Sequence, residues 1–152
     1  MYAWKREPYV DHIVMWLRYI DDIFLIWDGT DIEFREYFEI LKRNEDGLDF
    51  TYEIGNEEIV FLDTRIYIRN GVIQTTLHRK ATATNAILHA DSHHSKSLVW
   101  RIPFGEFLRI KRNCSEEVEC SKHSAQTRER LLKREYPRRI LNTCYSKAGM
   151  KC

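Results

Sequence analysis

The hydrophobic pattern begins with two apolar runs that are separated by a pair of acidic residues. Residues 13–20 and 23–27 are of strand length and rich in aromatic and β-branched side chains, which predicts two buried strands. Asp21 and Asp22 lie between the runs and would form the tip of a tight hairpin. Such tips need positive φ angles, which Asp tolerates, although Asn-Gly and Asp-Gly are more usual.

A helix is expected directly after this hairpin. Thr30 and Glu33 have the spacing of a capping box, in which each side chain bonds the backbone of the other residue. Apolar side chains follow at the intervals of one helix face, at Phe34, Phe38 and Leu41. The helix should end near Asn44, because residues 44–47 (Asn-Glu-Asp-Gly) carry turn signals.

Three further strand-like runs follow, at residues 48–54, 58–69 and 72–79. The second run alternates apolar and polar residues, as a strand with one buried face does. The dipeptides between the runs, Gly55-Asn56 and Asn70-Gly71, are hairpin signals, and Asn-Gly is the stronger one. The order is therefore strand, strand, helix and three strands, which predicts an α+β fold.

Beyond the last strand the pattern becomes helical. Residues 79–85 form a polar connector, so we place a domain boundary there, between residues 1–80 and 81–152. Residues 97–102 predict a short amphipathic helix, and Pro103 suits the first turn of a second short helix.

A longer helix and a final short helix complete the pattern. Ser115, followed by the acidic residues of 116–119, is a typical N-cap with an acidic first turn. This helix should end before Pro137, and residues 138–145 should form the last one. The two short helices joined at residues 102–103, together with the longer helix, then make a helix-turn-helix-like trio.

The charges of the chain are unevenly distributed. Residues 1–64 hold 6 Lys and Arg against 16 Asp and Glu, whereas residues 65–152 hold 18 against 7. Such asymmetry favours an anionic partner for the basic part, although solvated charged faces could also produce it. No apolar run has the length of a membrane span and no signal-peptide core is present. We therefore expect an intracellular protein of the nucleus or cytoplasm, without membrane contact.

The acidic pair at the hairpin raises the question of a metal ion. The adjacent carboxylates of Asp21 and Asp22 repel one another, and a divalent cation such as Mg²⁺ would remove that conflict. A solvated acidic turn is the alternative, because Asp is a common turn residue. The residues alone leave both interpretations open.

The histidines and cysteines match no zinc-binding template. Residues 88–94 contain three His and one Asp, but without a second cluster we favour an N-cap at Ser92 or Ser95, with a helix beginning near Lys96. Packing between helices is also preferred for a second set, Cys114, Cys120, His123 and Cys144. Four cysteines make no disulfide framework in a chain of this size, which favours a reducing compartment and a free thiol at Cys152.

The acidic hairpin resembles the metal-binding hairpin of reverse transcriptases, which has the pattern Tyr-x-Asp-Asp. Here the pattern is Tyr19-Ile20-Asp21-Asp22, with Arg18 before it and Ile23-Phe24 after it. The longer form, Arg-Tyr-Ile-Asp-Asp-Ile-Phe, is similar to that of Penelope-like retroelements.

The segment after the helix carries the same resemblance. Residues 61–66 (Phe-Leu-Asp-Thr-Arg-Ile), followed by Asn70-Gly71, resemble the family's hairpin that holds the primer end. An ion pair between Asp63 and Arg65 is the alternative without a functional role.

A third segment, residues 101–115, resembles the Penelope-like pattern Ile-Pro-x-x-Gln-Phe-Leu-Arg-x-Arg-Arg-x-Cys-Ser. It departs from the pattern at Glu106, where Gln is usual, and at Lys111, where Arg is usual. His94 also matches a histidine that the family carries at this point. A match over fifteen residues is more specific than the short acidic motif.

The resemblance, which extends from about Trp16 to Tyr145, implies a partial polymerase palm in residues 1–80 and an all-α thumb in residues 81–152. It also implies that, in the complete enzyme, the acidic pair binds catalytic Mg²⁺ and the thumb binds an RNA-template/DNA-primer duplex. The candidate nucleic-acid contacts are Tyr19, Arg79, Lys80, Arg101, Arg109, Lys111, Arg112, Arg128, Arg130, Lys133 and Arg134. The alternative for the basic helices is a bundle with a charged face.

The sequence does not decide whether this chain is an enzyme. Reverse transcriptases hold two metal ions with carboxylates from two palm segments. Asp21 and Asp22 would be the contribution of one segment, and the partner aspartate of the other segment is missing. We therefore expect a fragment of a retrotransposon's RNA-directed DNA polymerase that is inactive alone. The alternative is a non-catalytic nucleic-acid-binding helix-turn-helix protein derived from such a transposable element.

Overall fold

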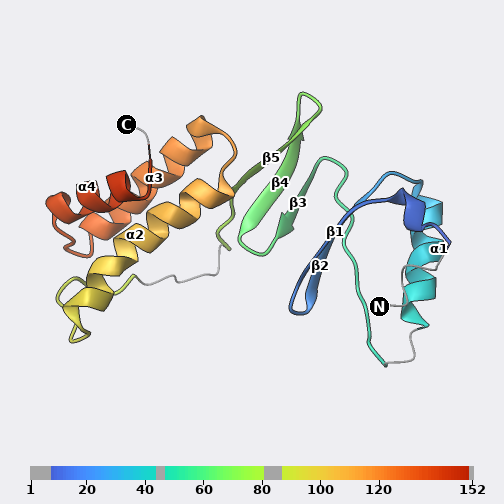
Figure 1. The fold of residues 1–152 in the computed structure, drawn as a ribbon, viewed down its shortest axis with the longest axis horizontal. Helices are drawn as coiled ribbons and strands as arrows, with labels where there is room; N and C mark the ends of the chain where they lie inside the picture. The colour runs from blue at the N-terminus through green and yellow to red at the C-terminus, as the bar shows by residue number, and fades with distance from the viewer. Residues whose placement is uncertain (1–7, 44–46, 81–86, 151–152) are drawn as a thin grey trace. The chain divides into compact units, whose positions relative to one another are not determined.

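The computed structural model describes residues 8–43, 47–80 and 87–150 (Figure 1). These residues form two small antiparallel sheets and four α-helices, three of which follow the second sheet. The predicted α+β fold with a helical C-terminal region is therefore confirmed.

The chain divides into two compact units, unit 1 (residues 1–54) and unit 2 (residues 55–152). The second sheet belongs with the helices of unit 2, because its last strand contacts two of them. The palm and thumb expected for residues 1–80 and 81–152 are parts of a polymerase, and that assignment stays a prediction.

Unit 1 begins with the antiparallel hairpin that the two apolar runs predict. Its strands are β1 (Ile13–Tyr19) and β2 (Asp22–Trp27). The two turn residues are Ile20 and Asp21, whereas Asp22 is already the first residue of β2. The prediction that both aspartates form the tip is therefore wrong by one residue, because the strand pairing includes the second one.

The strand β1 is exposed, although its apolar sequence predicts burial. Val14 and Leu17 have exposed fractions of 62% and 52%, while most residues of β2 are half-buried. A two-stranded sheet has two open edges and too few neighbours to cover both faces. Apolar content predicts burial only where another layer is present to provide it.

A short 3-10 turn, η2 (Val10–His12), precedes the hairpin and α1 (Asp31–Lys42) follows it. The predicted capping box is confirmed at the start of α1. The backbone N–H of Glu33 donates to Thr30 Oγ1 at 3.3 Å, and the backbone N–H of Thr30 donates to the Glu33 carboxylate at 2.8 Å. The helix end expected near Asn44 lies outside the described residues.

Aromatic residues that precede and follow α1 in the sequence pack against it. The Trp27 ring, at the end of β2, lies 5.5 Å from the Tyr37 ring, and the Tyr52 ring lies 4.4 Å from the Phe38 ring. Residues 48–54 do not form the expected strand. The segment pairs with no strand, and its Tyr52 side chain packs against α1 instead.

The sheet of unit 2 is an antiparallel meander of β3 (Glu58–Phe61), β4 (Thr64–Arg69) and β5 (Val72–Leu77). Asn70 and Gly71, with φ angles of 52° and 73°, make the two-residue turn between β4 and β5. The Asn-Gly prediction is therefore confirmed, because both central residues of this turn type need positive φ.

The run expected as one strand, residues 58–69, is two strands joined by a tight turn at Leu62 and Asp63. Leu62 has a φ of 55°, and Phe61 pairs with Thr64 across the turn. The alternation of apolar and polar residues continues through the turn, so periodicity does not reveal it. The other proposed turn, at residues 55–56, does not join two strands.

The ion pair between Asp63 and Arg65, given above as the alternative without a functional role, is not formed. Asp63 lies in the turn, where its carboxylate is 2.7 Å from the guanidinium of Arg109. Arg65 instead pairs with Glu58 across the two strands. This alternative is wrong because it placed Phe61, Asp63 and Arg65 on one face of a single strand, whereas the chain turns at Leu62 and Asp63.

Three helices follow the sheet: α2 (Lys96–Asn113), α3 (Glu117–Leu132) and α4 (Arg138–Lys147). The two short helices expected on either side of residues 102–103 are a single helix. Pro103 lacks a backbone N–H and removes one helical hydrogen bond, but its ring is buried in the interior. That burial offsets the lost bond, so α2 continues through the proline.

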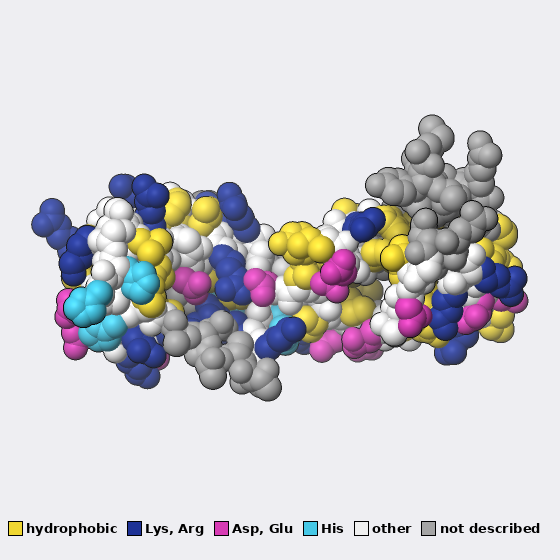
Figure 2. All heavy atoms as spheres, turned by 90° about the horizontal axis from the view of Figure 1, so that it is seen from below, with side chains coloured by type: hydrophobic (Ala, Val, Ile, Leu, Met, Phe, Trp, Pro, Cys, Tyr) yellow, Lys and Arg dark blue, Asp and Glu magenta, His cyan; other side chains and the backbone are white. Residues whose placement is uncertain are grey.

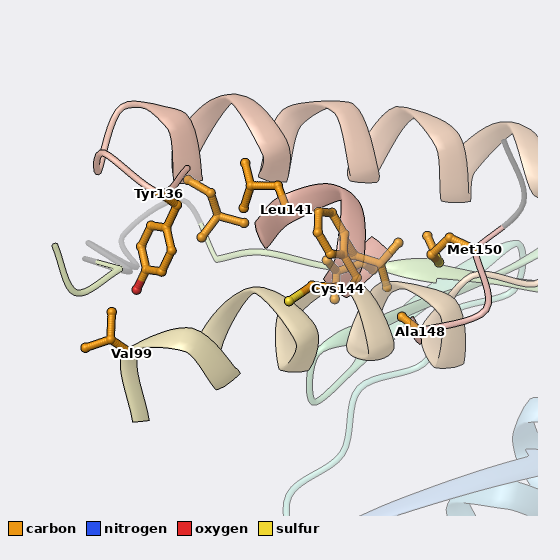
Figure 3. Packing of buried hydrophobic residues seen from close by; sticks show 10 residues of the cluster. Val99, Tyr136, Leu141, Cys144, Ala148 and Met150 are labelled. Carbon is orange, nitrogen blue, oxygen red and sulfur yellow. The ribbon is translucent and has the colours of Figure 1, made fainter. Parts of the chain in front are cut away.

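The core of unit 2 lies between these helices (Figure 3). Its buried side chains come from every helix and from the sheet: Leu77, Val99, Phe107, Ile110, Leu131, Tyr136, Leu141, Cys144, Ala148 and Met150. Burial raises the pKa of the Cys144 thiol, which lies 3.9 Å from the Trp100 carbonyl oxygen. No described helix is both long enough and apolar enough to cross a membrane.

The start of α3 is fixed to the sheet by Ser115 and Glu116. Ser115 was expected to be the N-cap, but Glu116 takes that position. Ser115 instead lies beside β5, where its N–H donates to the carbonyl of Thr75 and its Oγ accepts from the N–H of Thr75. The carboxylate of Glu116 accepts from the Tyr67 hydroxyl at 2.5 Å, which raises the pKa of Tyr67 to about 12.

One turn further along, a second polar group joins β5 to α3. The Thr76 hydroxyl donates to the Glu119 carboxylate at 3.2 Å and lies 3.1 Å from His123 Nε2. Desolvation lowers the pKa of His123, so this ring is favoured in its neutral form. The sheet and α3 are therefore held together by two successive sets of polar contacts.

Candidate nucleic-acid interface

The connection between α3 and α4 is a Schellman turn. The N–H of Tyr136 donates to the carbonyl of Leu131 at 3.2 Å, and the N–H of Glu135 donates to the carbonyl of Leu132 at 3.0 Å. Glu135 has a φ of 62°, in the left-handed region where Gly is usual. Tyr136 and Leu131 are both buried, which supplies the apolar contact of the motif. Pro137 then begins α4.

The helix α4 has one buried face and one polar face. Leu141, Cys144 and the following Ala148 point into the core. The exposed side of the helix carries side chains that can donate or accept hydrogen bonds, at Arg138, Arg139, Asn142, Thr143, Ser146 and Lys147. A short, exposed polar helix that follows a tight turn is the part of a helix-turn-helix unit that can enter a DNA groove.

Arg128 connects the two helices on this side. Its guanidinium on α3 donates to the Oδ1 atom of Asn142 on α4. This contact defines the orientation of the Asn142 amide, and it leaves the amide NH₂ group as a donor. Arg128 was expected to contact phosphate, and the structure places it beside the polar face of α4.

Three of the predicted phosphate contacts, Arg79, Arg109 and Lys133, are engaged in ion pairs within unit 2. Arg79 lies 3.0 Å from Glu106 and 3.2 Å from the Thr127 hydroxyl. Arg109 pairs with Asp63 at 2.7 Å. Burial, followed by the positive charge of Arg79, lowers the pKa of the nearby Arg130. This partly buried charge cluster holds the sheet turn, α2 and α3 together.

Other predicted contacts are solvent-exposed cations. Lys80, Arg101, Arg112 and Arg134 are exposed and have no carboxylate partner among residues 8–43, 47–80 and 87–150. Lys111 donates to the carbonyl of Gly149, and Lys133 pairs with Glu129 at 2.7 Å. On the face seen in Figure 2, Lys and Arg side chains of the helical region occur in several groups rather than in a single patch.

The acidic hairpin of unit 1 has a strained tip. Ile20 has a φ of 53°, which is unfavourable for a β-branched residue. The guanidinium of Arg18 donates to the carbonyl of Ile20 at 2.9 Å, across the turn. Asp21 and Asp22 are both exposed, and Asp22 pairs with Tyr19 in the strand register.

Two exposed carboxylates fit only part of a magnesium site. Mg²⁺ takes six oxygen ligands, of which Asp21 and Asp22 could supply two, with water filling other positions. Among the described residues, no His, Cys or further carboxylate lies close enough to Asp21 and Asp22 to complete a metal site with them. Tyr19 and the acidic pair lie in unit 1, whereas the other predicted site residues all lie in unit 2.

The polar face of α4 was not predicted from the sequence. Residues 138–145 were predicted as a helix, but Arg138, Arg139 and Asn142 were not identified as candidate contacts. The signal was present, because Pro137 marks a helix start and exposed polar residues recur at intervals of three and four. The Schellman turn was harder to see, since Glu occupies the position at which Gly is expected.

Comparison with known families identifies one match, which lies in unit 2. Residues 86–146 match the model of the animal helix-turn-helix domain. The matched range includes α2, α3 and most of α4. Neither the curated proteins nor the solved structures gave a match to this chain. The helical region of unit 2 is thus similar to a helix-turn-helix domain.

Proposed function

We propose that the helices of unit 2 form a nucleic-acid-binding helix-turn-helix module that uses α4 to contact duplex DNA. The observation that carries this proposal is the Schellman turn from α3 to α4 within the segment that matches a helix-turn-helix domain. An α-helix fits the major groove of B-DNA, where base edges present distinct hydrogen-bonding patterns.

The side chains of α4 suit this role. Arg138 and Arg139 lie in its first turn, where recognition helices contact base edges. Arg pairs well with guanine, and the NH₂ group of Asn142, whose Oδ1 already accepts from Arg128, can donate to an acceptor on a base edge. Exposed cations such as Arg112 and Arg134 would bind phosphates without reading sequence.

The test is binding of the full chain to a fluorescent mixed-sequence DNA duplex, followed by anisotropy at several salt concentrations. Arg138→Ala with Arg139→Ala should weaken binding by about tenfold or more and make its salt dependence shallower. The matched control is Arg35→Ala with Arg43→Ala, which removes two exposed arginines from unit 1. Equal losses in both double variants, or no binding by the unaltered chain, would contradict the proposal.

We propose a second function on the basis of the hairpin of unit 1, namely that of a reverse transcriptase fragment. The supporting observation is the positive φ of Ile20 beside Asp21 and Asp22, because strained residues cluster at functional sites. Asp21 and Asp22 would hold Mg²⁺, which in polymerases activates the 3′-hydroxyl of the primer and stabilises the leaving phosphates. An RNA-template/DNA-primer duplex would then be the partner.

A primer-extension assay separates the two functions. The purified chain, given an RNA template, a DNA primer, nucleotides and Mg²⁺, should bind the duplex without extending it, because two carboxylates do not complete a two-metal site. Extension that disappears in the variant Asp21→Asn with Asp22→Asn would establish the catalytic function. It would also show that the expectation of inactivity is wrong.

A further inference from the structure

A second segment lies against the turn between α3 and α4. Residues 89–92 form a turn of their own, closed by a hydrogen bond from the N–H of Ser92 to the carbonyl of His89 at 3.0 Å. The N–H of Ala90 donates to the carbonyl of Arg134 at 3.0 Å. The stretch that precedes α2 is thus attached by its backbone to the Schellman turn.

This attachment brings three potential metal ligands together: His89, Asp91 and Glu135. Their ligand atoms all lie within 4.8 Å of one another, and His89 Nε2 is 3.7 Å from a Glu135 carboxylate oxygen. Within the described ranges, no other set of three His, Cys, Asp or Glu residues is gathered in this way. We name these three residues the turn triad. His89 is half-buried and the two acids are exposed, so an ion can enter from solvent.

The identity of residue 135 needs an explanation that the turn alone does not give. The position has a φ of 62°, where Gly is favoured and Glu is strained. Arg134, its neighbour, provides only its backbone carbonyl to the attached segment. A carboxylate at position 135, in contrast, faces the imidazole of His89. A ligand function for this carboxylate would account for the presence of Glu.

We propose that the turn triad binds Zn²⁺. An imidazole nitrogen and two carboxylate oxygens are suitable zinc ligands, with a water molecule in the fourth tetrahedral position. The ligand atoms are somewhat farther apart than in a bound site, and side-chain rotation at the exposed acids can close the difference. The imidazole distinguishes this site from one for Mg²⁺ or Ca²⁺, which prefer oxygen ligands.

The bound ion would join two parts of unit 2 that are distant in sequence. His89 and Asp91 precede α2, whereas Glu135 lies between α3 and α4. A zinc ion here would hold the turn that determines the direction of α4. By binding only the folded state, it would also stabilise that state. This site does not depend on whether α4 binds DNA, so either proposal can fail without the other.

The first test is calorimetric titration of the full chain with ZnCl₂, with MgCl₂ as the control ion. We expect one zinc ion per chain, a zinc-dependent rise in Tm, and no comparable effect of Mg²⁺. Replacing zinc with Co²⁺ should give the visible absorption of a tetrahedral complex. An absence of stoichiometric zinc binding would overturn the proposal.

Variants then identify the ligands. His89→Ala, Asp91→Asn and Glu135→Gln should each weaken zinc binding at least tenfold, whereas Glu129→Gln on α3 should leave it unchanged. Glu135→Gly provides a variant that fits the turn geometry and still removes the ligand, so lost binding cannot be attributed to misfolding. Zinc binding that survives these changes, or that is lost instead with Cys114→Ser, would contradict the assignment to the turn triad.

Discussion

Leu141 on α4 is fully buried, whereas Leu17 on β1 exposes 52% of its surface, although both lie in regular elements. Unit 2 packs three helices and a sheet around one core. In the described part of unit 1, one α-helix accompanies the two-stranded sheet, and apolar side chains such as Val14 and Ile20 are exposed to solvent. An apolar sequence therefore forms a core only where enough layers of secondary structure pack together.

Removing a core side chain from unit 2 should reduce the stability of the protein more than any other change considered below. Leu141→Ala should lower the free energy of unfolding by about 3 kcal/mol, because it leaves a cavity among α2, α3 and α4. Leu17→Ala should change it by no more than about 0.5 kcal/mol. Urea denaturation of the full chain measures both. Similar costs for the two variants would mean that β1 is covered in solution.

The capping box of α1 should act within unit 1 alone. Thr30→Ala removes an N-cap and should destabilise α1 by about 1 kcal/mol. Amide hydrogen exchange in α1 should accelerate about fivefold, while exchange in α4 stays unchanged. Thr51→Ala, at another exposed threonine of unit 1, is the control. Faster exchange in both helices would show that the two units are not independent.

Replacing Glu135, the residue with left-handed backbone conformation in the Schellman turn, should stabilise the protein rather than destabilise it. Glu135→Gly in metal-free buffer should raise the free energy of unfolding by about 1 kcal/mol, because Gly adopts this φ without strain. Glu129→Gly, inside α3, should lower it by about the same amount. Thermal unfolding compares the two variants. Destabilisation by both would indicate that the Glu135 side chain supports the turn without an ion.

A pH dependence that is absent at neutral pH is expected at the sheet of unit 2. The folded state raises the pKa of Tyr67 from 10.0 to about 12, mainly through its hydrogen bond to Glu116. Its contribution to stability is therefore complete below pH 10 and disappears as the pH rises towards 12. The tyrosinate absorbance of the unaltered chain, minus that of Tyr67→Phe, should show this late titration. A difference curve centred near pH 10 would mean that the hydrogen bond is absent.

Features with a local cause could be predicted from the sequence. The Thr30–Glu33 capping box and the Asn70-Gly71 turn depend on residues close in the chain, and both are present. The strands of the first hairpin also followed from their apolar pattern, and the last two helices from their sequence pattern and from Pro137 between them. Their boundaries differ from the structure by only a few residues.

Features that depend on distant partners could not be predicted in this way. Asp63 pairs with Arg109, and Ser115 bonds β5 instead of capping α3, because the fold brings those partners close. Pro103 continues a helix because its ring is buried, which local rules for proline do not anticipate. The turn triad likewise needs the contact between Ala90 and Arg134.

The candidate site was predicted only in outline. The nucleic-acid-binding helical region is supported by the helix-turn-helix match, and Asp21 and Asp22 lie at the hairpin as expected, one residue out of register. The magnesium ion and the polymerase partner stay predictions. The polar face of α4 was missed because charge counts do not indicate which cations share a helix face.

The polar contacts between the sheet and α3 have a mechanical consequence. Tyr67 and Thr76 fasten β4 and β5 to the first two turns of α3, and α3 in turn sets the direction of α4. The turn at Asn70 and Gly71 is therefore connected to α4 through these polar contacts and through α3. If α4 binds DNA as proposed, a spectroscopic label at Asn70 would report the orientation of unit 2 on a duplex from a position outside the proposed contact surface.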